Sequence, residues 1–341
     1  MIDRLISWEE EKWQLEGNWW KLESILFNAF DTCVSWQEKA KQSIASALLN
    51  NLNWIVPKKG PLAVLFFDWP TWVGKTELVH VLAAVLLWNS TRITKIKGEL
   101  FQEAHSATNL IWAPKSYVGY WEPPIFASIY DHYNAAKEEW KVSAIIRTLP
   151  MFNIILFDEV EKMHPRVHQT LLGILDDWLL TLSNWAVVDF STSLIIMTSN
   201  IGAREKRDID EKPSMGFVEK DKDKEKKDID KKWFKLFSPE FFGRIDQRVE
   251  FDYLTEKDCW NIIDIQVKRI NQAFETYTWV NEFTKLHLEL SESAYSELIR
   301  QWYSKEKGAR EINRVFHRHI NAKFWSILSS TSEIFEWKDY K

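Results

Sequence analysis

The chain has 341 residues, of which 45% are hydrophobic, and this length favours about two domains with a sizeable core. Its formal net charge of −5 and its lack of a long apolar stretch argue against nucleic-acid binding through a basic face and against a membrane span. Cys33 and Cys259 do not form a disulfide framework and the acidic N-terminus does not resemble a signal peptide, so we expect a cytoplasmic protein.

The first part of the sequence predicts a helical lead-in followed by alternating strands and helices. Short apolar runs predict buried strands, and apolar residues at helical spacing predict a helix over Lys75–Leu87. The expected strands are Pro61–Phe67, Ile93–Ile96, Phe152–Phe157 and Ser193–Thr198. This alternation implies an α/β domain with a mainly parallel sheet that helices cover on both faces.

The pattern changes after the polar stretch Arg204–Lys232, whose mixed charges favour a solvated loop. Residues 255–275 and 291–330 look helical, with a strand signal only near Leu286–Leu290. We therefore expect a second domain that is small and mostly helical. The predicted limits are 1–24 for the lead-in, 25–250 for the α/β domain, 251–330 for the small domain and 331–341 for a tail.

A phosphate-binding loop is predicted directly after the first strand. Residues 69–76 read W-P-T-W-V-G-K-T, close to the pattern G-x-x-x-x-G-K-[ST], in which backbone N–H groups cradle phosphates at a helix N-terminus. Lys75 would reach the β and γ phosphates, and Thr76 would hold Mg²⁺. The strict pattern fails at Trp69, where glycine is expected, so the strand–loop–helix context carries part of the argument. The expected nucleotide-binding residues are Trp69, Pro70, Thr71, Trp72, Val73, Gly74, Lys75, Thr76, Glu77 and Asp158.

Two acids supply the second half of this predicted ATP site. Residues 154–159 read I-I-L-F-D-E, an apolar strand that ends in two carboxylates. Asp158 would bind Mg²⁺ through water, and Glu159 would orient and polarise the attacking water. The alternative is a pair of ordinary surface acids, but the carboxyl edge of a parallel sheet is where ligands bind.

A series of segments in the same order resembles the second ATPase module of the ClpA/ClpB/ClpC family of AAA+ ATPases, from about residue 25 to residue 328. The segments are V-S-W-Q-E at 34–38, P-T-W-V-G-K-T-E-L at 70–78, A-P-K-S-Y-V-G-Y at 113–120, L-F-D-E-V-E-K-M-H-P at 156–165, L-L-G-I-L-D-D at 171–177, M-T-S-N-I-G at 197–202, S-P-E-F-F-G-R-I-D at 238–246 and K-G-A-R at 307–310. The resemblance implies a P-loop AAA+ parallel sheet with flanking helices, a small helical C-terminal domain and ATP hydrolysis.

The resemblance also implies roles for three more residues. Asn200 is similar to the sensor that positions the attacking water. Arg244 resembles the arginine finger that one subunit inserts into its neighbour's site, where it supplies positive charge to the transferring phosphoryl group. Arg310 resembles the second sensor, on the small domain. A finger that acts across subunits implies a homo-oligomer, with a hexameric ring expected. Without the resemblance, both arginines would be interpreted as surface ion pairs.

Two loops would contact proteins. Tyr117 and Val118, in S-Y-V-G, resemble the pore loop that grips an unfolded protein substrate, and the alternative is a buried core tyrosine. Met215, Gly216 and Phe217 resemble the tripeptide that docks into a ClpP-like peptidase, and an apolar patch in a charged loop suits docking. Disaggregases of the ClpB type lack this tripeptide, so both peptidase-coupled and disaggregase action stay open. A P-loop ATPase outside protein quality control is disfavoured by Tyr117 and by the segment around Arg244.

Tryptophan is unusually frequent and glycine is scarce. The chain has 20 Trp and 10 Gly, where a glycine share of about 7% would give roughly 24 Gly. An indole in the phosphate loop would occupy the space that the backbone needs close to the phosphates. We hypothesise that many of these tryptophans are glycine codons read with the wrong genetic code, and TGG codons at 69 and 72 would contradict this. If the tryptophans are real, we expect a degenerate, non-catalytic scaffold. Tryptophans at family glycine positions are Trp36, Trp69, Trp72, Trp112, Trp178, Trp185 and Trp302.

Overall fold

The structure is a computed structural model of the chain. It describes residues 22–34, 36–52, 60–68, 73–87, 93–106, 153–182, 186–201, 236–278 and 288–302, with shorter pieces at 110, 124–127, 129, 233, 311, 314, 316, 318 and 335–337. In this part of the chain, no helix is long and apolar enough to cross a membrane.

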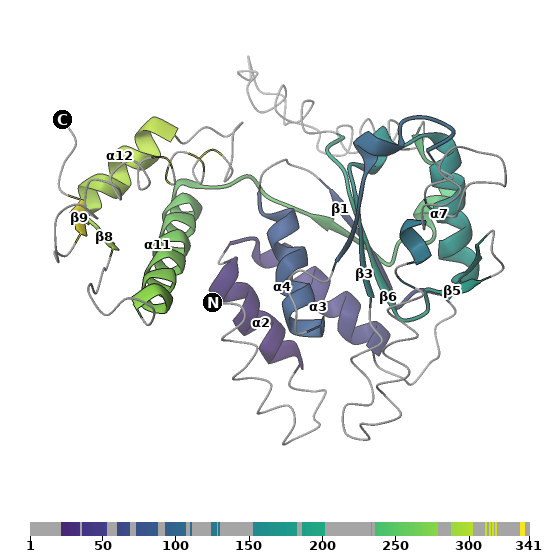
Figure 1. Cartoon of the computed structure of the whole chain (residues 1–341), viewed down its shortest axis with the longest axis horizontal. Coiled ribbons are helices and arrows are strands. Elements are labelled where there is room, and N and C mark those ends of the chain that lie inside the picture. The colour runs from purple at the N-terminus through teal and green to yellow at the C-terminus, as the bar shows by residue number, and fades with distance from the viewer. Residues whose placement is uncertain are drawn as a thin grey trace, which may run out of the picture.

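A five-stranded, all-parallel sheet forms the centre of the molecule (Figure 1). Its strands, in spatial order, are β2 (Thr94–Lys97), β3 (Asn153–Asp158), β6 (Ser193–Thr198), β1 (Ala63–Asp68) and β7 (Gln247–Glu250). The α/β fold and the parallel sheet are thereby confirmed, with the predicted strands displaced by no more than two residues at either end. The strand β7 was not predicted. Val249 is its one buried side chain, so the sequence there shows no apolar run.

Helices cover both faces of the sheet, as the alternation of elements predicted. The helices α2 (Leu22–Cys33), α3 (Glu38–Leu52) and α4 (Lys75–Leu87) lie on one face, and α7 (Pro165–Asp177) lies on the other (Figure 1). Because side chains alternate along a strand, Leu65 and Phe67 join the core on the first face, while Val64 and Phe66 join the core on the second. The second core also contains Trp233, Phe237 and Phe241, the last of which lies on α10 (Pro239–Phe242).

Short elements extend the α7 side of the sheet. The strands β4 (Leu179–Thr181) and β5 (Val187–Asp189) form an antiparallel pair after α7. Two 3₁₀ helices follow the ends of β2 and β3: η2 (Gly98–Phe101) and η3 (Val160–Lys162). The backbone N–H of His164 donates to the carbonyl of Phe101 at 2.8 Å, which ties the end of η2 to the residues after η3.

The C-terminal elements form a smaller unit beside the sheet domain. It contains α11 (Glu256–Thr278), α12 (Glu292–Trp302) and a parallel pair of strands, β8 (Leu288–Leu290) and β9 (Phe335–Trp337) (Figure 1). The Asn271 side chain on α11 bonds both the N–H and the carbonyl of Leu288, which fixes β8 against that helix. The strand β9 lies within the segment expected to be a tail, and α2 begins before residue 24. The domain limits themselves stay a prediction.

Candidate active site

The candidate site lies at the carboxyl edge of the sheet, where β1, β6 and β3 end side by side. Phe67 pairs with Thr198, and Phe157 pairs with Met197, so the residues after these strands come out at one level. The phosphate-loop helix α4 follows β1, and the two predicted acids end and follow β3. Ligands of parallel α/β sheets bind at this edge.

Lys75, the first residue of α4, is buried in this site. Its ammonium donates to the carbonyl of Ser199 at 2.6 Å and lies 3.5 Å from Oδ1 of Asn200. Burial lowers the pKa of Lys75 to about 8, although the charges of Asp68, Glu161 and Asp158 oppose this. Gly74 precedes it with a φ of +104°, a left-handed backbone that suits glycine. The loop lysine predicted from the sequence therefore lies next to the predicted sensor asparagine.

Asp158 ends β3 in a strongly hydrogen-bonded setting. Thr198 donates from Oγ1 to Oδ1 of Asp158 at 2.7 Å, and Lys95 pairs with Oδ2 at 2.7 Å. Burial alone would raise the pKa of Asp158, but these two partners outweigh burial and hold it below its usual value, so the carboxylate is ionised at neutral pH. An ionised carboxylate and a hydroxyl, the donor types of Asp158 and Thr76, are the hard oxygen ligands that Mg²⁺ prefers, so the chemistry of the predicted donors fits this ion.

Glu159 and Asn200 are in direct contact. Nδ2 of Asn200 donates to Oε1 of Glu159 at 3.1 Å, and the backbone N–H of Asn200 donates to Oε1 of Glu161 at 3.1 Å. Glu159 itself has a left-handed backbone, with φ +58°, and its N–H donates to Oγ1 of Thr198 at 3.1 Å. Hydrogen bonds therefore connect Asp158, Glu159, Thr198 and Asn200 into one group.

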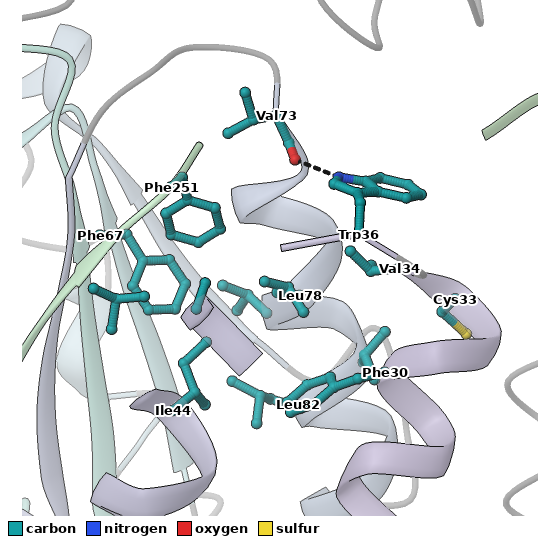
Figure 2. Close-up of a cluster of buried hydrophobic side chains, with 14 of the residues drawn as sticks. Phe30, Cys33, Val34, Trp36, Ile44, Phe67, Val73, Leu78, Leu82 and Phe251 are labelled. Atoms are coloured by element: carbon teal, nitrogen blue, oxygen red, sulfur yellow. Dashed lines mark hydrogen bonds between the residues drawn. The ribbon is translucent and has the colours of Figure 1, made fainter. Parts of the chain in front are cut away.

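Val73 and Gly74, at the end of the phosphate loop, contact the segment between α2 and α3. The indole N–H of Trp36 donates to the carbonyl of Val73 at 2.8 Å (Figure 2). A Cβ added at Gly74 would lie 3.3 Å from the same nitrogen. Trp36 is buried in the core cluster with Val34 and Leu78. One of the unexpected tryptophans is thus accommodated with its polar atom satisfied.

Glu77, in the first turn of α4, forms an ion pair with Arg269 of α11. Both side chains are about one third exposed, at 33% for Glu77 and 34% for Arg269. This pair connects the phosphate-loop helix to the small C-terminal unit. Thr76, between Lys75 and Glu77, is half-buried.

Arg244 forms its ion pair with Asp176, in the last turn of α7. Its side chain is 53% exposed. Within one chain, this contact matches the surface ion pair that was the alternative interpretation of this residue. A half-exposed guanidinium is also accessible to a neighbouring molecule.

Several predicted site residues lie outside the described part of the chain. They are Trp69, Pro70, Thr71, Trp72, Tyr117, Val118, Met215, Gly216, Phe217 and Arg310. Their assignments stay predictions.

The backbone at Trp178 supports the tryptophan hypothesis, whereas the backbone at Trp36 does not. Trp178, at the C-cap of α7, has φ +45°, a left-handed conformation that glycine adopts without strain. At Trp36 the backbone does not require glycine, because the non-glycine residues with positive φ in the described chain are Gln37, Glu159 and Trp178.

The sequence did not single out four residues that complete the site. Thr198 and Lys95 hold Asp158, and Lys162 donates to Oε2 of Glu159 at 2.7 Å and to Oε1 of Glu99 at 2.9 Å. Lys95 and Thr198 lie in the predicted strands next to β3, so strand order would have revealed them. Lys162 and Glu99 carry no such signal, because each looks like an ordinary surface charge.

Two family models match the chain. Residues 129–248 match the model described as AAA domain (Cdc48 subfamily). Residues 254–332 match the model of the C-terminal, D2-small domain of ClpB protein. The matches meet close to the point where the sheet domain gives way to α11.

The curated relatives are chaperones. The chain is 32% identical over 284 residues to the chaperone protein ClpB of Aquifex aeolicus, covering 83% of this chain and 26% of that protein. It is 32% identical to the probable chaperone protein ClpB 1 of Chlorobaculum tepidum, covering 83% of this chain and 59% of that protein. The chain thus spans between about a quarter and three fifths of these two relatives. Among solved structures, the S. cerevisiae Hsp104-ADP complex aligns with a TM-score of 0.70 at 25% identity, over 93% of this chain and 50% of that one.

Proposed function

Because the chain is an AAA+ ATPase module of the Clp/Hsp100 family with a ClpB-type D2-small domain, we propose that it is the ATP-driven motor subunit of a protein unfoldase. The observation that carries this proposal is the group formed by Lys75, Asp158, Glu159 and Asn200 at one sheet edge. These residue types are those that phosphoryl transfer to water requires.

Each residue of the group has a distinct task in ATP hydrolysis. Lys75 neutralises phosphate charge, and Asn200, which lies between Lys75 and Glu159, positions the attacking water. Glu159 accepts a proton from that water. Thr76 and Asp158 would hold Mg²⁺, which supplies positive charge to the phosphate oxygens when bound.

Arg244 would complete the site of a neighbouring subunit, and this requires an oligomer, for which a hexameric ring is proposed. The exposed guanidinium and its single-chain partner Asp176 are compatible with an exchange of partners on assembly. Arg310 would report nucleotide state to the small domain. The expected cytoplasmic location stays a prediction.

The substrates are proposed to be unfolded protein chains, gripped by Tyr117 and Val118. The curated relatives are named chaperone protein ClpB, which favours the disaggregase candidate. The tripeptide Met215, Gly216 and Phe217 favours a second candidate, in which the ring feeds a ClpP-like peptidase.

ATP binding, ATP hydrolysis and substrate unfolding measured on the same variants test this proposal. Glu159→Gln should bind ATP but lose at least about a hundredfold in kcat, in the range of a missing general base. Tyr117→Ala should hydrolyse ATP but not unfold a tagged substrate. Asp177→Asn, an exposed acid at the end of α7, serves as the matched control.

Because of the tryptophans in the predicted phosphate loop, each variant is also made in a second parent protein. The same measurements are made with Trp69→Gly and Trp72→Gly combined. Hydrolysis only in this background supports the genetic-code hypothesis. If neither background binds ATP, the motor function is excluded and the non-catalytic scaffold remains.

A further inference from the structure

Lys162, the last residue of η3, is shared between two carboxylates from different segments of the chain. Its ammonium donates to Oε2 of Glu159 at 2.7 Å, just before η3, and to Oε1 of Glu99 at 2.9 Å on η2. The two acids raise the pKa of Lys162, so the side chain is protonated throughout the physiological range. One cation thus bridges the proposed catalytic base and an acid that belongs to another crossover of the sheet.

Both carboxylate oxygens of Glu159 accept hydrogen bonds from the protein. Oε1 accepts from Nδ2 of Asn200 at 3.1 Å, and Oε2 accepts from Lys162. A general base must present an oxygen to the water that it deprotonates. A charge-assisted bond to Lys162 holds the carboxylate more strongly than the neutral bond to Asn200 does. The orientation of the base therefore depends on how firmly Lys162 holds Oε2.

Glu99 is held where it can compete for Lys162. The backbone at Gly98 packs so closely on the carbonyl of Glu159 that an added Cβ would lie 2.1 Å from it. The His164 N–H bond to Phe101 fixes the other end of η2 at 2.8 Å. Because η2 is attached to η3 at both ends, the Glu99 carboxylate stays beside Lys162, although its side chain is 60% exposed.

We propose that Lys162 is a positioning residue that restrains Glu159 and that Glu99 weakens this restraint by sharing the ammonium. The inference rests on the proposed role of Glu159 as the base. Removing Lys162 frees Oε2 for water, whereas removing the charge of Glu99 gives the ammonium entirely to Glu159. The two neutral variants therefore change the rate of hydrolysis in opposite directions, which a merely structural role of either residue does not produce.

The size of the effect follows from the exposure of the pair. The Lys162 side chain is 38% exposed and that of Glu159 is 28% exposed, so solvent weakens the ion pair. Such pairs contribute up to about 1 kcal/mol, which corresponds to a change in kcat of roughly two- to fivefold. Binding of ATP does not involve this contact, so KM stays within about twofold.

Steady-state ATP hydrolysis by the full chain tests the inference. Lys162→Gln should raise kcat at unchanged KM, Glu99→Gln should lower kcat, and Lys162→Arg should restore the parental value. Glu99→Gln should have no effect when Lys162→Gln is also present, because Glu99 acts only through the ammonium. Glu103→Gln, which removes an exposed acid from the same segment, is the matched control.

Two kinds of failure are distinguishable. If the parent hydrolyses ATP and Glu159→Gln abolishes hydrolysis, but the Lys162 and Glu99 variants shift kcat in the same direction or not at all, the inference alone is wrong. If Glu159→Gln leaves hydrolysis intact, Glu159 is not the base and the inference falls while ATP hydrolysis stands. If no background hydrolyses ATP, the proposed function falls and the inference falls with it. All variants are made in both phosphate-loop backgrounds, and circular dichroism identifies any that does not fold.

Discussion

Gly98 is the residue on which the geometry of the acid pair depends most directly. A Cβ at this position would lie 2.1 Å from the carbonyl of Glu159 and 3.0 Å from that of Asp158, so the backbone of both acids would have to move. Gly98→Ala should therefore destabilise the fold by roughly 1–3 kcal/mol, as overpacking does, and lower kcat. Chemical denaturation and ATP hydrolysis measure the two effects.

A second glycine provides the control for this prediction. Gly173 lies within α7, and an added Cβ there meets no atom within 4 Å. Gly173→Ala should stabilise the protein by about 0.5–1 kcal/mol, because alanine loses less backbone entropy in a helix. Equal effects of the two alanine variants would contradict the importance of the Gly98 contact.

At Trp178 we expect the opposite effect, a gain of stability on substitution, because the backbone conformation there suits glycine better than tryptophan. Its φ of +45° is a left-handed conformation at the C-cap of α7, and its N–H donates to Ile174 at 3.0 Å. Trp178→Gly should raise the free energy of unfolding by about 1 kcal/mol. Asp177→Gly, one residue earlier inside the helix, should lower it by a similar amount. A loss of stability in Trp178→Gly would show that the indole contacts outweigh the strain.

The residues of the site differ in how far the sequence predicted them. Lys75 and Asp158 each belong to a local sequence pattern: a loop directly before a helix for Lys75, and an acid at the end of an apolar strand for Asp158. These patterns can be recognised in the sequence because the residues that form them are adjacent in the chain. Lys162 and Glu99 meet only through the packing of η2 on η3. No local pattern encodes such a contact, so the sequence alone did not reveal it.

At the scale of elements, α7 contacts η3 and the residues before α10 through His168, a half-buried histidine. Nε2 of His168 lies 2.8 Å from the carbonyl of Val160, and its ring centroid is 4.6 Å from that of Phe237. Burial lowers the pKa of His168 below its ordinary value of 6.5. The unfolded chain therefore binds a proton more readily than the folded one, and stability present above pH 6.5 should be lost as the pH falls through and below that value.

Urea unfolding between pH 5 and pH 8 measures this dependence. The slope attributable to His168 should approach but not exceed about 1.4 kcal/mol per pH unit. His168→Phe should flatten the curve below pH 6.5, whereas His105→Gln, at a side chain that is 72% exposed, should leave it unchanged. A parental slope that survives in His168→Phe would assign the acid sensitivity to another group.

The elements themselves followed from hydrophobic patterning wherever burial was complete. The strands β1 and β6 are buried at every position, and both were predicted as apolar runs. The strands β4, β5 and β7 are short and only partly buried, so no periodicity marked them. Tertiary pairing rather than local sequence decides such strands.

At the scale of the whole molecule, the pair formed by Glu77 and Arg269 joins the phosphate-loop helix to the small domain. Glu77→Arg should weaken this junction through repulsion and raise the KM for ATP, with a loss of stability below about 1 kcal/mol for a partly exposed pair. The double variant Glu77→Arg with Arg269→Glu should recover most of the loss. Calorimetry measures the change in stability, and ATPase titration at low and high salt measures the change in KM. If the double variant recovers neither, a direct charge interaction between the two residues is excluded.

The attachment of η2 to η3 also bears on how this architecture could diversify. The chain leaves the sheet after β2 and returns at β3, its immediate neighbour, and both ends of this excursion are fixed by Lys95, Lys162 and His164. The entropy of closing a loop grows only slowly with its length. Leu110, Phe126 and Ile129 of this excursion are buried in the second core. A segment of different length grafted between the fixed points would therefore leave the chemistry at the sheet edge intact only if it kept apolar side chains to fill that space.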